Sequence, residues 1–345
     1  MPTLSSVFAP LGDHLLTANS RGKLQIWQVP QPDNFLGTPP ALIASRQIHN
    51  CPVYCLIFIT ANSQLLLVSA SDEDICIWSW EALLMEGTGK GPLARLQSPQ
   101  HAHRRGGLGP LAETTSIAFD PSSATLYSGS GNGNAYAWDL SNHKCVTTYS
   151  GHTDMIHCLG LRRRHGQLVT GSEDSTMRLW DVRSAVCAHV LSPSLPPMTS
   201  QSAARAAPDA PVRESAPSLW CGCLALDEAE NWLAAGWGAG FISTVEMRSL
   251  ACVGCLPTSA PPQAVAFLPH SDARLVSIGA EKSVYTWKVT GELETRAACS
   301  SPSAFALAAR AGADGDVTVA VGGFAPAVDI FYDMSHKAVS LPIVV

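Results

Sequence analysis

Residues 151–184 read GHTDMIHCLGLRRRHGQLVTGSEDSTMRLWDVRS, and their pattern recurs along the chain. Within this stretch, LVTGSEDSTMRLWD has an apolar run, a tight polar turn and a second run that ends at Trp180-Asp181. Such alternation around a turn predicts a β-hairpin. The same shape returns at six other places, where the position of Trp180 is taken by Trp27, Trp78, Trp138, Val245, Trp287 and Phe331. The stretch is therefore the clearest copy of a repeat, not an isolated site.

The spacing of these seven copies predicts the fold. Successive copies are separated by 51, 60, 42, 65, 42 and 44 residues, and a period of about 40–45 is typical of four-stranded propeller blades. An apolar run precedes each hairpin and a short β-rich run follows it, which supplies an innermost and an outer strand. We therefore predict an all-β chain that forms one seven-bladed β-propeller over residues 1–345, with four-stranded antiparallel blades.

Two insertions interrupt the repeat, at residues 81–112 and 193–217. The first begins EALLMEG, which predicts a helical turn or two, and an outer strand is expected near 92–98. The second is rich in Pro, Ala and Ser and predicts a loop. We expect residues 99–112 of the first insertion and residues 193–217 to emerge at the same face, which makes that face a candidate for binding. The last run, KAVSLPIV (337–344), predicts an outer strand of the seventh blade, so we expect the ring to close by packing of that blade against the first.

The composition argues against several classes of protein. Charged residues make up 14%, below the roughly 25% of an average domain. The net charge of −6 does not favour a broad nucleic-acid surface. The 11 cysteines show no framework spacing, and neither a secretory start nor an apolar run of about 18 residues is present. We expect a protein of a reducing compartment, without membrane association.

The fourth copy carries polar residues that belong together. Thr170 is expected on the strand beside Trp180, and His152 can link Thr170 to Asp174 in the turn. A buried indole N–H needs a partner, and leaving such a group unpaired costs about 1–3 kcal/mol. We interpret His152, Thr170, Asp174 and Trp180 as a structural network of the blade. A hydrolase or metal site is disfavoured because the other copies recur without the His and the Asp.

Other candidates for chemistry are weaker. Cys252-Val-Gly-Cys255 is a single C-x-x-C on a predicted outer strand, where the two side chains are expected on opposite faces. His103, Arg104 and Arg105 form a basic cluster that is a candidate for partner binding or simply a solvated loop. The basic run 162–165 (RRRH) falls in a turn. Motifs of phosphate-binding loops, zinc proteases and serine hydrolases are absent from the sequence, so we expect no catalytic residue, cofactor or metal.

Several stretches resemble known proteins. Gly151-His152 and Trp180-Asp181 resemble the repeat of the WD-repeat β-propeller family. More narrowly, the chain is similar to the THO complex subunit 6 family in GHTDMIHCLGLR, SEDSTMRLWDVRSA, WCGCLALD and IHNCPVYCL followed by IWSWEALL. The resemblance spans most of the chain. It implies a nuclear, non-catalytic scaffold and docking subunit of the THO/TREX assembly, which couples transcription and mRNA processing to mRNA export.

The resemblance also bears on partners. It implies other THO/TREX subunits, coiled-coil ones among them, with possible higher-order assembly through the complex and RNA contact that is indirect or weak. Members of that family usually begin with a segment ahead of the first blade, and this sequence nearly lacks one.

Trp180-Asp181-Val182-Arg183 supports an alternative. W-D-x-R is similar to the motif by which some propellers dock, as substrate receptors, on the adaptor of a cullin ubiquitin ligase, and Arg183 would be the docking residue. A catalytic site in the central channel is a third hypothesis. It would need carboxylates or histidines on the innermost strands, which are almost wholly apolar.

Overall fold

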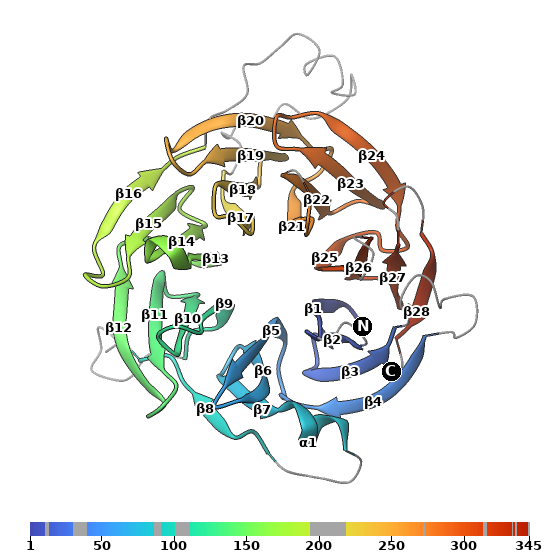
Figure 1. Ribbon diagram of the computed structural model, residues 1–345, viewed down its shortest axis with the longest axis horizontal. Coiled ribbons are helices and arrows are strands. Elements are labelled where there is room, and N and C mark those ends of the chain that lie inside the picture. The colour runs from blue at the N-terminus through green and yellow to red at the C-terminus, as the bar shows by residue number, and fades with distance from the viewer. Residues whose placement is uncertain are drawn as a thin grey trace.

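The computed structural model is a ring of seven four-stranded sheets (Figure 1). It describes residues 1–10, 14–29, 40–85, 91–100, 111–193, 219–271, 273–312, 316–332, 334 and 337–343. In every sheet the four strands pair in chain order and antiparallel to their neighbours. The predicted fold class, an all-β seven-bladed propeller with antiparallel blades, is confirmed.

The strands run from the centre of the ring to its rim within each blade. Blades one to three contain β1 (Thr3–Phe8), β2 (His14–Asn19), β3 (Lys23–Gln28), β4 (Ala41–Gln47), β5 (Val53–Ala61), β6 (Gln64–Ser71), β7 (Ile75–Ser79), β8 (Ala94–Leu96), β9 (Thr114–Asp120), β10 (Thr125–Ser130), β11 (Asn134–Asp139) and β12 (Lys144–Ser150). Blades four and five contain β13 (Ile156–Arg162), β14 (Gln167–Ser172), β15 (Met177–Asp181), β16 (Cys187–Leu191), β17 (Cys221–Leu226), β18 (Trp232–Trp237), β19 (Phe241–Glu246) and β20 (Ala251–Pro257). Blades six and seven contain β21 (Pro262–Phe267), β22 (Arg274–Gly279), β23 (Ser283–Lys288), β24 (Leu293–Ala298), β25 (Ala304–Ala311), β26 (Val317–Gly323), β27 (Ala327–Phe331) and β28 (Val339–Pro342).

The core lies between the blades. Each hydrophobic cluster of the described residues joins two neighbouring blades, and together these clusters go once around the ring. Strands such as β14 are covered on both faces, so Leu168–Ser172 are all buried. This explains why the second strand of each repeat reads as a continuous apolar run and not as an alternation.

The ring closes between blades seven and one, as expected from the sequence. Phe8 and Trp27 pack in one cluster with Ile330 and Leu341. The guanidinium of Arg310 lies 4.7 Å from the centre of the Phe8 ring. Strand β28 pairs with β27 of its own blade, so the seam is held by side-chain packing.

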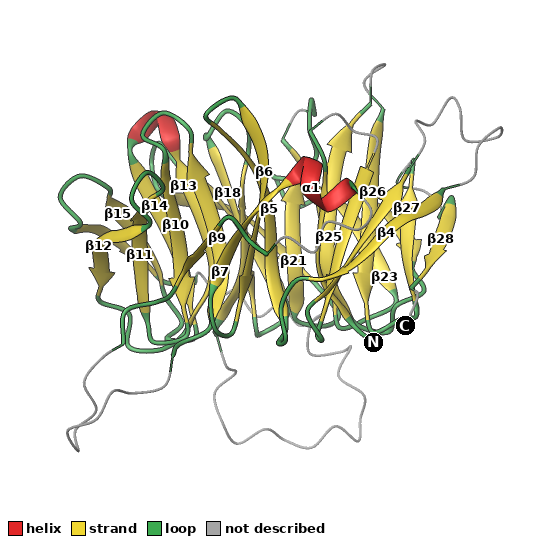
Figure 2. Cartoon of the chain, turned by 90° about the horizontal axis from the view of Figure 1, so that it is seen from below, coloured by secondary structure: helices red, strands yellow, loops and turns green. Residues whose placement is uncertain are grey.

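The two faces of the ring carry different loops. Loops that join first to second and third to fourth strands lie on one side, together with helix α1 (Trp80–Leu84) and the short 3₁₀ turn η2 (Arg163–His165), as Figure 2 shows. We call this side the helix face and the opposite side, where the N-terminus lies, the terminal face. Helix α1 is the helical turn expected from EALLMEG, and β8 falls inside the expected range 92–98. Strands β8 and β16 end, and β9 and β17 begin, at the terminal face, while residues 101–110 and 194–218 fall outside the described residues.

The described part of the chain has no helix long and apolar enough to cross a membrane.

Candidate docking pocket and its hydrogen-bonded floor

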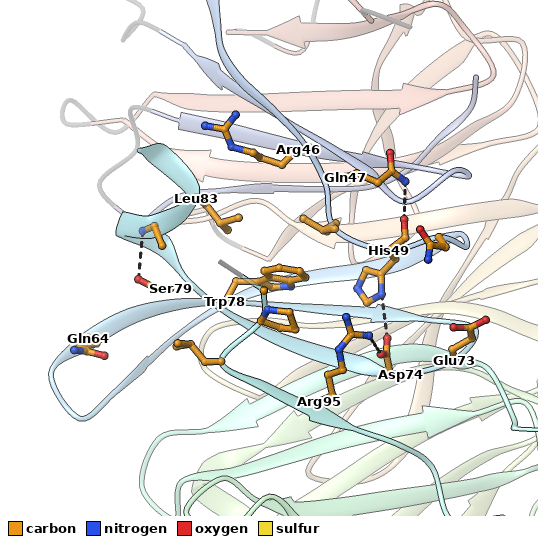
Figure 3. Close-up of a pocket in the computed structure, with 16 residues that line it drawn as sticks. Arg46, Gln47, His49, Gln64, Glu73, Asp74, Trp78, Ser79, Leu83 and Arg95 are labelled. Atoms are coloured by element: carbon orange, nitrogen blue, oxygen red, sulfur yellow. Dashed lines mark hydrogen bonds and ion pairs between the residues drawn. The ribbon is translucent and has the colours of Figure 1, made fainter. Parts of the chain in front are cut away.

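A pocket with a volume of about 580 Å³ opens at the rim, between blades one and two (Figure 3). Strand β4 borders it on one side, and β7, α1 and β8 border it on the other. Its apolar lining includes Trp78, Leu83 and Leu93, and its charged lining consists of Arg46, Arg95, Glu73 and Asp74. It therefore combines apolar side chains with two arginines and two carboxylates.

The shape of blade two explains the pocket. Its outer strand β8 has three residues and pairs only with Ile75–Ile77 of β7. At Ser79 the chain turns into α1, because the Ser79 side chain caps the helix by accepting from the N–H of Ala82 at 3.3 Å. The Trp78–Ser79 end of β7 is left uncovered by an outer strand, and the pocket occupies this place.

The floor of the pocket is a chain of buried hydrogen bonds. The Nδ1 atom of His49 lies 3.0 Å from Oδ1 of Asp74, and Nε2 lies 2.7 Å from Oγ of Ser69. The indole N–H of Trp78 donates to the same Oγ at 2.9 Å. Since the carboxylate can only accept, Nδ1 carries the proton and Nε2 accepts from Ser69. Every polar atom of this chain is thereby satisfied, which is the condition for burying it.

Arg95 connects this floor to solvent. Its Nη1 atom donates to Oδ2 of Asp74 at 2.6 Å, while 57% of its side chain is exposed. Burial alone would raise the pKa of Asp74, but the hydrogen bonds and charges of His49 and Arg95 lower it to about 2. Asp74 is therefore anionic at neutral pH and holds Arg95 at the mouth of the pocket.

The same place offers a set of possible metal ligands. Single ligand atoms of His49, Asp74 and Cys76 all lie within 4.8 Å of one another. Both ring nitrogens of His49 are already engaged, however, and Arg95 brings a positive charge onto Asp74. Burial, and then the charge of Asp74, raise the pKa of the Cys76 thiol to about 12, so a thiolate ligand is disfavoured. The arrangement fits a structural network better than a metal centre.

Large apolar side chains are exposed in this region. Leu93, which lines the pocket, and Met85, which follows α1, are each 60% exposed. Arg46 donates to the main-chain oxygen of Met85 at 3.1 Å, which holds the end of α1 beside β4. Exposed apolar side chains around a concave site are typical of surfaces that receive an anchor residue of a partner.

Blade four contains the network expected from the sequence. His152 Nδ1 lies 2.8 Å from Oδ2 of Asp174, and its Nε2 lies 2.7 Å from Oγ1 of Thr170. The indole N–H of Trp180 donates to Thr170 at 2.9 Å. Burial lowers the pKa of His152, although Asp174 acts in the opposite direction. All four predicted residues thus meet in one chain of hydrogen bonds.

Four other blades keep part of this chain. In each of them the indole N–H of a tryptophan donates to a hydroxyl on the neighbouring strand. The pairs are Trp27 and Thr17, Trp138 and Ser128, Trp287 and Ser277, and Trp237 and Ser243. In blade five, Val245 stands where the repeat has Trp, and the roles of the two middle strands are exchanged: β18 supplies the indole and β19 the hydroxyl. Burying an indole with its N–H satisfied is the common element of these copies.

Sequence reasoning missed the second complete network. The premise that the other copies lack the His and the Asp is wrong for blade two, where His49 and Asp74 fill both roles. Blade two reads Ile48-His49 where blade four reads Gly151-His152, and its indole lies nine residues after the hydroxyl instead of ten. The signal was a histidine shortly before the first strand of blade two, as in blade four. The different spacing between the hydroxyl residue and the tryptophan concealed it.

The remaining predicted residues are dispersed. Arg183 is exposed in the turn between β15 and β16, and its N–H donates to Asp181 at 3.0 Å. His103, Arg104 and Arg105 lie outside the described residues.

The C-x-x-C motif differs from the expectation. A bulge at Val253 places Cys252 opposite Val245 and Cys255 opposite Ser243, two positions of the same face. Cys252 is exposed and Cys255 half-buried. Burial and the neighbouring Cys252 raise the pKa of Cys255 to about 11. The expectation of opposite faces is wrong, but a protonated thiol still does not favour a metal site.

Comparison with known proteins shows what the chain is similar to. The family described as "WD domain, G-beta repeat" matches residues 41–79, 108–139 and 143–181. THO complex subunit 6 of Arabidopsis thaliana is 27% identical over 290 residues, which cover 82% of this chain and 72% of that protein. THO complex subunit 6 of Homo sapiens is 26% identical over 346 residues, 99% of this chain and 92% of that protein. The THO complex subunit 6 homolog of Danio rerio is 25% identical over 346 residues, with 99% and 97% covered.

Proposed function

Because the chain is a WD-repeat β-propeller that is similar, over most of its length, to THO complex subunit 6 of plants and animals, we propose that it is a non-catalytic docking subunit of a THO-type complex. Its place of action is the nucleus. There it joins coiled-coil subunits of a THO/TREX assembly that couples transcription and mRNA processing to mRNA export, and its contact with RNA is indirect or weak.

The observation that carries a docking role is the pocket between blades one and two. Its lining contains apolar side chains, among them Leu93, which is 60% exposed, and it contains Arg46 and Arg95 together with Glu73 and Asp74. We propose that an apolar side chain of a coiled-coil subunit inserts beside Leu93 and that acidic residues flanking this side chain face Arg46 and Arg95. Burying Leu93 and Met85 in such a contact removes apolar surface from water, which favours association.

The buried polar groups support a non-catalytic role. In both complete networks the imidazole, hydroxyl and carboxylate are hydrogen-bonded to one another and to an indole. In blade two these groups form the floor of the pocket, but their polar atoms are engaged with one another, and in both blades their hydrogen bonds stabilise the sheet. This use of the residues is consistent with a protein that supplies surfaces and no reaction.

The test is tagged purification from nuclear extract after RNase treatment, followed by mass spectrometry. Wild-type protein is compared with Leu93→Asp and with Val146→Asp, a matched change at a residue that is 57% exposed on β12 of blade three. We expect THO subunits with the wild type and with Val146→Asp, and their loss with Leu93→Asp. If THO subunits are missing from the wild-type sample, the proposed function is wrong.

A second function rests on the exposure of Arg183 at the end of W-D-x-R. As the substrate receptor of a cullin ubiquitin ligase, the chain would dock on the adaptor through this side chain. Recovery of a cullin adaptor without THO subunits in the same purification would favour this function, and its loss in Arg183→Ala would assign the contact.

A further inference from the structure

The turn between β13 and β14 carries a basic run that the pocket does not use. Arg163 and Arg164 lie in η2, and both are exposed. The corresponding turns at 62–63 of blade two, 121–124 of blade three and 227–231 of blade five contain no Lys or Arg. The positive charge is therefore particular to blade four and is not a property of the repeat.

A carboxylate of blade five holds the main chain of this turn. Glu230 is buried, and its carboxylate accepts from the N–H of Arg163 at 2.9 Å and from the N–H of Arg164 at 3.1 Å. Its main-chain oxygen accepts from the guanidinium of Arg162 at 3.2 Å. The ring of His165 also lies 3.3 Å from this carboxylate. Since main-chain N–H groups and this imidazole engage the carboxylate, the turn is positioned without use of the exposed guanidinium groups of Arg163 and Arg164. Of the ion pairs among described residues, none involves Arg163 or Arg164.

Arg183 extends the same surface. The N–H of Val182 donates to the main-chain oxygen of Gly166 at 3.0 Å, so the turn after β15 lies directly against the turn after β13. Asp181 accepts from the N–H groups of Arg183 and Ser184, and this carboxylate too is engaged by the main chain. Three exposed arginines therefore lie on two adjoining turns of the helix face.

Acidic residues lie on both neighbouring blades: Asp120 on blade three, and Asp227 and Glu228 on the turn of blade five that also carries Glu230. Asp227 accepts from the N–H of Trp232 at 2.6 Å, and Glu228 is exposed. Asp120 of blade three accepts from the hydroxyls of Ser122 and Ser123 at 2.7 and 2.8 Å. Burial would raise the pKa of Asp120, but these hydrogen bonds and the charge of Arg163 lower it. Asp120 thus lies within electrostatic reach of Arg163 while its oxygens are used inside its own turn.

We infer that Arg163, Arg164 and Arg183 form a docking surface for an Asp- and Glu-rich segment of a partner protein. A guanidinium group binds a carboxylate through two parallel hydrogen bonds. The two turns contain no Phe, Tyr or Trp, which are the stacking platforms of single-stranded RNA binding, and the net charge of −6 also disfavours RNA. The inference rests on the proposed function, because the partner is a subunit of the same complex, and it names the chemistry of that partner.

The test uses the purified chain and two probes, a fluorescein-labelled poly-glutamate peptide and a labelled oligouridylate of the same length. Binding is measured by fluorescence anisotropy at low and at raised salt. The test variants are Arg163→Gln/Arg164→Gln and Arg163→Glu/Arg164→Glu, which keep the N–H groups held by Glu230. The control matched to the Glu variant is Arg21→Glu/Lys282→Glu, which makes the same change in net charge at two exposed residues on the terminal face.

We expect poly-glutamate to bind the wild type and the control variant. Both test variants should bind it with an affinity that is lower by about tenfold or more. The inference is overturned if the control weakens binding as much as the test variants, if the wild type does not bind poly-glutamate, or if oligouridylate binds these arginines more tightly. The measurement needs no THO subunit, so its failure leaves the purification result standing. Conversely, a failed purification with intact peptide binding contradicts the proposed function alone.

Discussion

Blades two and four build the same hydrogen-bonded chain in different surroundings. In blade four, Trp180 is 1% exposed, and Asp174 is held by His152 and by groups of its own turn, including Thr176. In blade two, Trp78 is 7% exposed and lines a pocket, and Asp74 is held by a charged residue of the outer strand, Arg95. The comparison teaches that one structural network can end inside a blade or reach a surface. The length of the outer strand decides which, because a three-residue β8 leaves the end of β7 open.

The largest difference is expected for the two tryptophans. Trp180→Ala removes a fully buried indole and leaves Thr170 without its donor, so we expect a loss of about 3–5 kcal/mol in the free energy of unfolding. Trp78→Ala should cost less, because the pocket lets water reach the side of the cavity. Denaturant unfolding of both variants and the wild type gives the comparison. An unchanged unfolding midpoint in Trp180→Ala would contradict the role assigned to this residue.

The next effect distinguishes the two carboxylates. Asp74→Asn removes the charge that holds both His49 and Arg95, and hydrogen bonds to charged groups contribute about 1.5–3 kcal/mol. Asp174→Asn should lose less, because neutral donors, the N–H of Thr153 and the hydroxyl of Thr176, make much of its environment. Equal losses in the two variants would mean that Arg95 adds nothing to the network of blade two.

The same pair predicts a dependence on pH. The pKa of Asp74 is lowered to about 2, against about 3.9 for an unperturbed Asp. The folded state therefore binds this proton less readily than the unfolded state, so the contribution of Asp74 is present above pH 4 and is lost between about pH 4 and 2. Unfolding free energies measured across this range should fall less steeply in Asp74→Asn than in the wild type.

The sequence predicted the fold in detail because the repeat is a packing pattern. Seven similar hairpins, three of whose intervals are 42–44 residues and each with an apolar run before it, were enough to place the blades and the outer strand β28. The pocket could not be predicted, since it depends on how far β8 extends along β7 and on the approach of β4 from another blade. The prediction that Cys252 and Cys255 lie on opposite faces was also wrong, because a bulge at Val253 adds a residue that a regular alternation does not contain.

The complete network of blade two could not be predicted from the sequence either. Its four residue types are ordinary ones, and only their meeting in space identifies them. Ser69 replaces Thr, the turn is one residue shorter, and no Gly precedes His49. Residues joined by strand pairing tolerate such changes in spacing, because the register of β6 and β7 still places Trp78 beside the hydroxyl.

Histidine protonation gives a smaller effect in blade four. Burial lowers the pKa of His152, so the unfolded chain takes up this proton first as the pH falls below about 6.5. Stability should therefore decrease between pH 7.5 and 5.5, and the part due to His152 should disappear in His152→Asn. Thermal melts of both proteins at the two pH values test this. A pH-dependent decrease of the same size in both would show that other groups cause it.

The smallest effect on stability is expected where blade four meets solvent. Arg183→Ala removes an exposed side chain whose main-chain N–H, not its guanidinium, bonds to Asp181. We expect a change within about 0.5 kcal/mol and an unchanged thermal melt. If this variant unfolds the protein, Arg183 is part of the structure of its turn, and both docking roles that use it fail. An unchanged melt together with weaker binding to an acidic peptide would support a docking role for Arg183. The helix face of blade four would then differ from the pocket of blade two. The two basic turns would receive carboxylates, whereas the pocket receives apolar side chains.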